Sequence, residues 1–153
     1  RTPKPSVALA EKAMPIFAKQ RAKRGIDEFY HLYVLVTLSS GDEVAIEKNE
    51  IITITTDGSA RKGAESIDVA TPNATLASLM ERTQAKMGDK FFPYHVQSNN
   101  CQKFCLALLQ ANSISSPAAK RFVKQNLKFL PSGAVSILNG IAQMAGAFAT
   151  LTD

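Results

Sequence analysis

The stretch that most restricts how this chain can fold is residues 29–38. Aromatic and β-branched side chains dominate it, and apolar residues occupy both of its alternating faces, which is typical of a buried strand. The polar residues at 39–42 predict a turn, and 43–48 returns with the composition of a second strand. Residues 50–56 predict a third strand or a continuation of the second. The chain is therefore expected to contain an antiparallel sheet.

Three stretches after this sheet have helical spacing of their apolar residues. The first helix is expected to begin at about Thr75 and to end at Gly88, a residue type that favours the position after a helix. The second begins at Cys101 and continues with an inward face of apolar residues, namely Phe104, Cys105, Leu108 and Leu109. The serine and proline at 116–117 predict the start of a third helix, running to about residue 130.

Length and composition predict one domain with a flanking segment at each end. A chain of 153 residues, 45% of them hydrophobic, can bury a sizeable core. We expect this core at 26–112, a basic arm or helix at 1–25, and further helices at 113–153. The net charge of +5 permits an acidic partner, a phosphate-rich surface or no charged partner at all. No aromatic residues alternate with the charges of the basic arm, so we interpret it as a solvated segment and expect no nucleic-acid partner.

The uncharged segment at 134–150 contains many small residues. Its short length and its polar residues disfavour a membrane span. We expect a core helix there, or a helix that packs on a protein partner or on a membrane surface.

Cysteine and histidine usage restricts the chemistry of this chain. Cys101 and Cys105 are its only cysteines, and their spacing on one helix is awkward for a mutual disulfide. Free thiols indicate a reducing compartment such as the cytoplasm. With two histidines and no ligand spacing of the zinc kind, we expect no metal and no cofactor. The chain begins with Arg1 rather than methionine, so we expect a processed product or a fragment.

The most informative stretch for function is 94–104, which predicts a short strand, a polar turn and the start of the second helix. Asn99 and Asn100 suit the turn and the N-cap of that helix. Cys101 then lies where helix N–H groups point outward, and this environment favours the thiolate, the nucleophilic form of cysteine. The alternative is that Cys101 is a small core residue, as most free cysteines are.

A histidine can supply the base that a cysteine nucleophile needs. His31 opens the first predicted strand, and a sheet between the two residues can bring both to one rim, where imidazole takes the thiol proton and returns it to a leaving group. Glu47 on the second strand is the candidate for orienting the imidazole, although a register slip of one residue would turn it to the other face. The fallback carboxylates are Glu43 and Glu50, and His95 is a rival base.

These residues resemble the motifs of a known family. The segments 81–82, 87–88 and 94–104 resemble the box of the lecithin–retinol acyltransferase family in which a helix, a glycine and a tyrosine precede Asn-Cys-Glu-His-Phe. That family includes the H-box/NC-box phospholipases and acyltransferases, and relatives occur in RNA-virus polyproteins and phage genomes. The apolar strand 31–36 is similar to its H-box. The resemblance covers residues 29–111.

The resemblance implies an α+β, circularly permuted papain-like fold, whose antiparallel sheet carries the histidine and packs against the helix that starts with the cysteine. In this scheme Cys101 attacks an ester or amide carbonyl and forms a thioester, while His31 is first the base and then the acid. The family has a second histidine on the next strand, where this chain has none. Its longer hairpin would bring Glu47 to that place, and a carboxylate can orient an imidazole.

The family resemblance also suggests residues that support the nucleophile. The backbone N–H of Cys101 and that of a neighbour are candidate oxyanion donors, and Tyr94, Asn100 and Gln102 are expected to support the turn. Gln102 and Lys103 stand where the family has Glu-His. This departure affects the expected substrate class more than the thiol chemistry.

Two hypotheses of function follow from these residues. The first is a cysteine-dependent acyl hydrolase or acyltransferase that acts on a lipid ester or on a peptide or other amide. The second is a catalytically inactive binding or structural module of the same fold, such as a viral or virion-associated protein. The missing second histidine is the best support for the second hypothesis.

Overall fold

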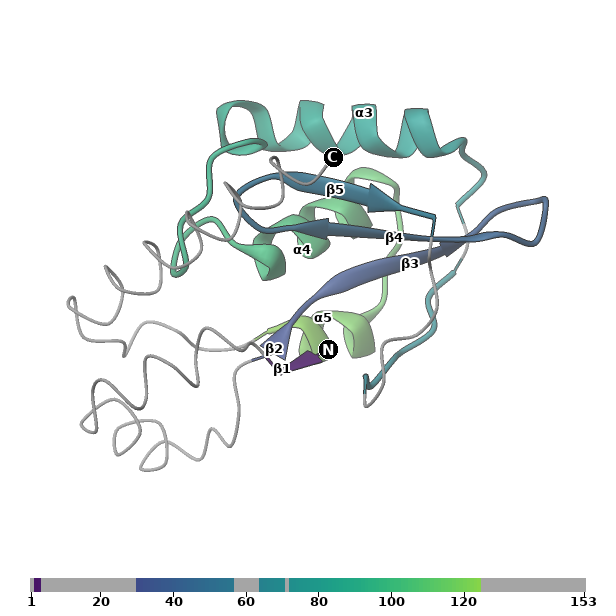
Figure 1. Cartoon of the computed structure of the whole chain (residues 1–153), viewed down its shortest axis with the longest axis horizontal. Coiled ribbons are helices and arrows are strands. Elements are labelled where there is room, and N and C mark those ends of the chain that lie inside the picture. Colours follow the sequence, from purple (N-terminus) through teal and green to yellow (C-terminus); the bar gives the residue numbers. More distant parts are fainter. Residues whose placement is uncertain (1, 4–29, 57–63, 71, 125–153) are drawn as a thin grey trace.

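The computed structural model describes residues 2–3, 30–56, 64–70 and 72–124 of the chain (Figure 1). The predictions for the basic arm at 1–25 and for the uncharged segment at 134–150 lie outside these residues. Within them, the architecture is α+β: a small antiparallel sheet with helices packed on one side.

Three strands in the order β3-β4-β5 form the main sheet. They are β3 (Tyr33–Thr37), β4 (Glu43–Lys48) and β5 (Ile52–Thr55), and each pairs antiparallel with its neighbour. The short strands β1 (Thr2–Pro3) and β2 (Tyr30–His31) form a separate antiparallel pair. The hairpin between β3 and β4 turns at Gly41, whose φ of 91° lies in the left-handed region that favours glycine.

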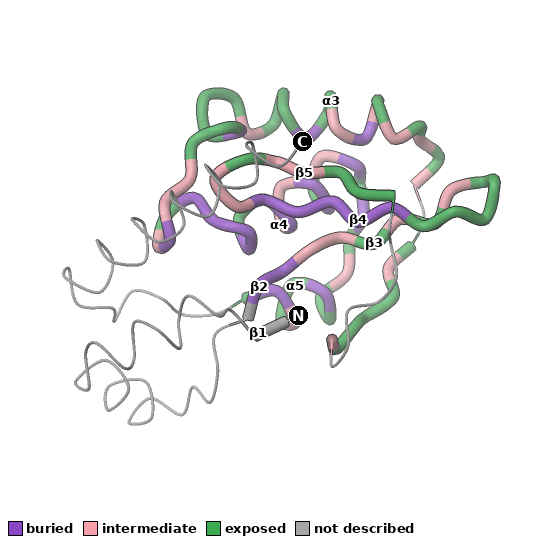
Figure 2. Tube along the Cα trace, in the orientation of Figure 1, coloured by how far each residue is buried: buried purple, intermediate pink, exposed green. Residues whose placement is uncertain are grey.

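The burial of the strands differs from the prediction for residues 29–38. That stretch is divided at Leu32 into β2 and β3, and β3 is half-exposed rather than buried on both faces, with Leu35 38% exposed. The buried strand is β4, which is paired on both sides and is buried from Val44 to its end at Lys48 (Figure 2). In the described sheet, β3 pairs with β4 on one side only. Amino-acid composition does not indicate whether a strand lies at the edge or in the centre of a sheet.

The helices begin and end close to the predicted signals. Helix α3 (Leu76–Met87) starts after Thr75, whose side chain accepts a hydrogen bond from the Ser78 N–H, and ends at Gly88 with a φ of 53°. The 3-10 turn η1 (Gly88–Lys90) follows directly. Helix α4 (Cys101–Ala111) starts at the predicted cysteine.

The third helix is shorter than its apolar spacing predicted. Helix α5 (Pro117–Val123) begins at Ser116 and Pro117, as expected from the N-cap serine and the proline in the first turn. It ends at Lys124, which already has an extended backbone with a ψ of 124°. The rest of the predicted helix lies outside the described residues.

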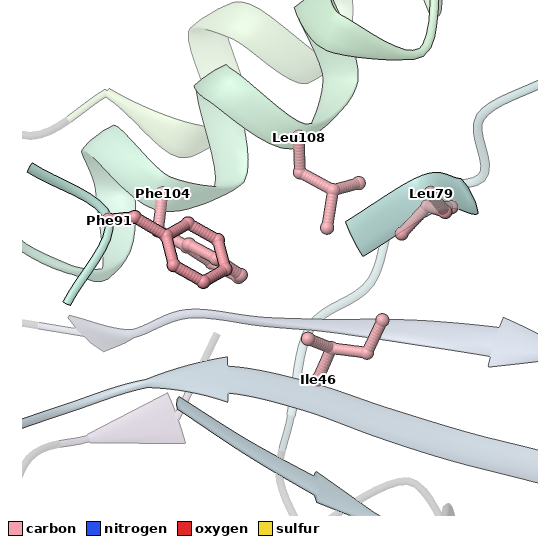
Figure 3. Packing of buried hydrophobic residues seen from close by; sticks show 5 residues of the cluster. All are labelled: Ile46, Leu79, Phe91, Phe104 and Leu108. Atoms are coloured by element: carbon pink, nitrogen blue, oxygen red, sulfur yellow. The ribbon is translucent and has the colours of Figure 1, made fainter. Parts of the chain in front are cut away.

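One face of the sheet packs against α3 and α4 and forms the main core (Figure 3). Ile46 of β4 contributes to this core at 0% exposure, and the cluster around it contains Leu79, Phe91, Phe104 and Leu108. Side chains from the neighbouring strands complete it, namely Val34, Val36 and Ile52. Because Ile46 is paired with both Val34 and Ile54, it lies at the middle of the sheet face that the helices cover.

Replacing Ile46 with alanine should lower the free energy of unfolding by about 2–5 kcal/mol, because the side chain is fully buried and leaves a cavity. Urea denaturation followed by circular dichroism measures the change. Leu35→Ala on the adjacent strand is the matched control, and its loss should be clearly smaller because Leu35 is 38% exposed. Equal losses for the two variants would contradict the assigned core.

Candidate functional site

The first turn of α4 is held by the residue before it. Asn100 is buried and is the N-cap of the helix, where its Oδ1 accepts a hydrogen bond from the Lys103 N–H at 3.1 Å. Its Nδ2 donates to the Val96 carbonyl at 2.6 Å, so both ends of the amide are used. Cys101 is the first residue of the helix and is 4% exposed, and the helix N–H groups around it create a positive local potential.

The segment before this cap is a tight turn, whereas a short strand followed by a polar turn was predicted for the start of 94–104. The backbone groups of His95 and Asn99 exchange two hydrogen bonds of 2.9 Å, which closes the turn. The Nδ1 atom of His95 lies 3.0 Å from the Ser98 hydroxyl and accepts from the Ser98 N–H at 3.3 Å. His95, the rival base, therefore has its Nδ1 engaged within its own turn.

His31 and Glu47 meet as the sequence predicted. Nε2 of His31 lies 2.7 Å from Oε2 of Glu47, and the two side chains are only 7% and 11% exposed. Glu47 is paired with Tyr33 across the sheet, so His31 reaches it diagonally, from two residues earlier in the chain. This contact selects Glu47 among the three carboxylates that the sequence left open.

The two fallback carboxylates lie in other environments. Glu43 is exposed and pairs with Thr37 at the far end of the hairpin. Glu50 follows the end of β4, and partial burial raises the pKa of its carboxyl group. Of these three residues, Glu47 is the one hydrogen-bonded to His31.

Cys101 lies beside the chain segment that carries His31. It belongs to a buried cluster with Leu32, the residue after His31, and with Cys105 and Val123. Because successive strand residues point to opposite faces and Ile46 packs in the core with α4, Glu47 leaves β4 on the other face of the sheet. Leu32 lies at the break between β2 and β3, so the residue that clusters with Cys101 directly follows the residue that is bonded to Glu47.

The second thiol is a poor nucleophile. Cys105 is buried one turn further along α4. Burial strongly raises the pKa of its thiol, and the negative charge of an ionised Cys101 raises this pKa further. Because the thiolate is the reactive form, Cys105 is disfavoured as the reactive cysteine.

The other predicted support residues lie around the start of α4. Gln102 is buried in the first turn of the helix, directly after Cys101. Tyr94 is half-buried at the entry to the turn that ends at Asn99. Their roles as supports of an oxyanion site stay predictions.

Two buried residues hold the segment that leads to Cys101: Lys48, which the sequence did not single out, and Asn99, which was expected only to form the turn. Lys48 is 0% exposed, and its Nζ donates to the carbonyls of Phe91 at 2.5 Å and Phe92 at 2.8 Å. Asn99 donates from Nδ2 to the carbonyls of Lys90 at 2.7 Å and Pro93 at 2.5 Å. The sequence did contain a sign that Lys48 is buried. Lys48 lies two residues after Ile46 in β4, so the two side chains leave the strand on the same face.

Comparison with known proteins found no family model, no curated protein and no solved structure that matches this chain. In the part of the chain that the structure describes, no group of three potential metal-ligating side chains comes together. None of the helices described is both long enough and apolar enough to cross a membrane.

Replacing Glu47 with alanine should lower the free energy of unfolding by about 3–5 kcal/mol, because it removes one partner of a buried pair and leaves His31 buried. Glu43→Ala on the same strand is the matched control. Glu43 is exposed, so its loss should stay within about 0.5 kcal/mol. Denaturant unfolding of both variants at pH 7 measures the difference, and equal losses would contradict the buried pair.

Lys48 should make the stability of the protein depend on pH in the alkaline range. Burial lowers the pKa of Lys48 from its ordinary value of 10.5 to about 8, so between these pH values the unfolded chain binds a proton that the folded chain has lost. Stability rises with pH wherever the unfolded state binds more protons. The contribution of Lys48 is therefore fully present above pH 10.5 and is lost as pH falls through about 8.

The measurement for Lys48 is the free energy of unfolding of the wild type minus that of Lys48→Met, determined across this range of pH. Taking the difference cancels the groups that titrate equally in both proteins. We expect it to increase from pH 8 to pH 10.5. A difference that is flat or decreases would show that Lys48 does not titrate with a lowered pKa.

Proposed function

We propose that this protein is a cysteine-dependent acyl hydrolase or acyltransferase with a circularly permuted papain-like fold, related to the lecithin–retinol acyltransferase family. The observation that carries the proposal is the buried hydrogen bond between His31 and Glu47. It is supported by the place of Cys101 at the capped start of α4, in a cluster with the residue next to His31.

In the first step, the thiolate of Cys101 attacks the carbonyl carbon of an ester or amide. His31 has already taken the thiol proton, and the imidazolium gives it to the leaving alcohol or amine when the tetrahedral intermediate collapses. The carbon–oxygen or carbon–nitrogen bond breaks, and a thioester with Cys101 forms. Because Glu47 is bonded to Nε2, this proton exchange uses Nδ1 of the His31 ring.

In the second step, a water molecule or an acceptor alcohol or amine attacks the thioester carbonyl. His31 takes the proton of this nucleophile and returns it to the departing sulfur of Cys101. Glu47 stabilises the imidazolium that exists during both steps and fixes the ring orientation, which is the role of the carboxylate in other triads. The backbone N–H groups at the start of α4 are the oxyanion donors.

The proposal requires that the imidazole of His31 reaches the sulfur of Cys101 across the rim of the sheet at Leu32. A base has to lie within hydrogen-bond reach of the proton that it takes, and this distance often shortens when substrate binds. A crystal structure of the protein acylated at Cys101 measures it. Cys101 and His31 held apart by packed hydrocarbon in that structure would exclude His31 as the base.

Replacing Cys101 with alanine should abolish labelling by a thiol-directed acyl probe and all turnover of esters and amides, because the variant has no nucleophile. Cys105→Ala is the matched control on the same helix and should keep both activities. Labelled-peptide mass spectrometry locates the adduct, and a panel of phospholipids and peptide amides identifies the substrate class. Labelling that persists without Cys101 would overturn the proposal.

The rate of iodoacetamide alkylation as a function of pH gives a second measurement. For an enzyme of this class, the midpoint for Cys101 should lie well below about 8.5, the pKa of a free cysteine. An ordinary midpoint, together with full function of Cys101→Ser, would instead favour an inactive binding or structural module.

A further inference from the structure

Four consecutive backbone carbonyls are bound by two buried side-chain nitrogens. Nζ of Lys48 binds the carbonyls of Phe91 and Phe92, while Nδ2 of Asn99 binds those of Lys90 and Pro93. We call this set of contacts the carbonyl clamp. The side chains of Lys48 and Asn99 are 0% and 8% exposed. The bond to Phe91 is buried and the other three are partly buried, and a hydrogen bond is stronger where water is excluded.

The carbonyl clamp connects the two halves of the candidate site. On the strand side, Lys48 follows Glu47 directly in β4, and Glu47 is bonded to His31. On the helix side, Asn99 precedes the N-cap Asn100, which precedes Cys101. The chain segment between them is anchored to both sides through its own carbonyls.

The two ends of the clamp are also fixed independently. Lys48 cannot shift along the sheet without breaking the pairing of β4, in which it lies opposite Ile52. Asn99 is held by two backbone hydrogen bonds to His95. A displacement of residues 90–93 would therefore break side-chain hydrogen bonds at both ends.

We propose that Lys48 and Asn99 are positioning residues for the candidate nucleophile: through the carbonyls of residues 90–93 they fix the start of α4, and with it Cys101, relative to the strand that carries Glu47. This inference rests on the proposed function. It assigns neither residue to the reacting atoms, because each acts through the backbone segment that it holds.

The experiment measures the pH dependence of Cys101 alkylation by iodoacetamide in the full chain, with the adduct located by peptide mass spectrometry. The variants are Lys48→Met and Asn99→Leu, which keep side-chain length or bulk but remove the donor. Each should move the alkylation midpoint towards about 8.5, the value of a free cysteine. Each should also speed amide hydrogen exchange in residues 94–100, because that segment loses its anchor.

Thr83→Val is the matched control. Thr83 is also 0% exposed and donates a buried hydrogen bond of 2.7 Å, to the Leu79 carbonyl within α3. Its loss weakens the fold without touching residues 90–93, so the alkylation midpoint should remain that of the wild type. This control separates positioning of Cys101 from a general loss of stability, and Asn99→Leu tests the clamp if Lys48→Met does not fold.

The outcomes separate this inference from the proposed function. A lowered midpoint in the wild type that His31→Gln raises, but that the folded clamp variants retain, would overturn the positioning role and leave the proposed function standing. An ordinary midpoint in the wild type that His31→Gln leaves unchanged would overturn both. A midpoint raised in the clamp variants and unchanged in Thr83→Val supports both.

Discussion

The described structure depends on hydrogen-bond partners for two residues of opposite charge that are buried next to each other at the end of β4. Glu47 and Lys48 leave the central strand on opposite faces, and each meets a partner there: the imidazole of His31 on one side, and two backbone carbonyls on the other. Buried charges are tolerated when hydrogen bonds replace their hydration. The short strand β2 and the segment before α4 are therefore both hydrogen-bonded to the end of β4.

The features that the sequence predicted best are those set by local chemistry. Helix starts at Thr75 and Ser116 agree because a hydroxyl that caps the first turn acts on neighbours in the chain. The cap at Asn100 agrees because its side-chain oxygen likewise acts on a neighbour in the chain. The bounds of β4 agree because polar turn residues flank its apolar run. Predicting the contact between His31 and Glu47 also required the register of the hairpin. The position of the turn and the alternation of apolar residues restrict that register.

The features that it predicted poorly depend on distant parts of the chain. The apolar residues around Leu35 indicated a buried strand, but burial is decided by which strand lies in the centre of the sheet. Residues 94–96 have strand-like composition, yet the backbone of His95 pairs with Asn99 and closes a turn. The burial of Lys48 depends on carbonyls more than forty residues away, and sequence alternation gives no direct sign of such a partner.

The order of residues in β4 has a consequence for how its hairpin can close. Val44, Ala45 and Ile46 are apolar on both faces, so they would tolerate an alignment that is one residue out of step. A slip in one direction would bring the ammonium of Lys48 to face the imidazole of His31. A slip in the other direction would bring the carboxylate of Glu47 to face the negative ends of the Phe91 and Phe92 carbonyl dipoles. Adjacent opposite charges thus discriminate between alignments that hydrophobicity alone leaves nearly equivalent, and they favour the native register of the hairpin.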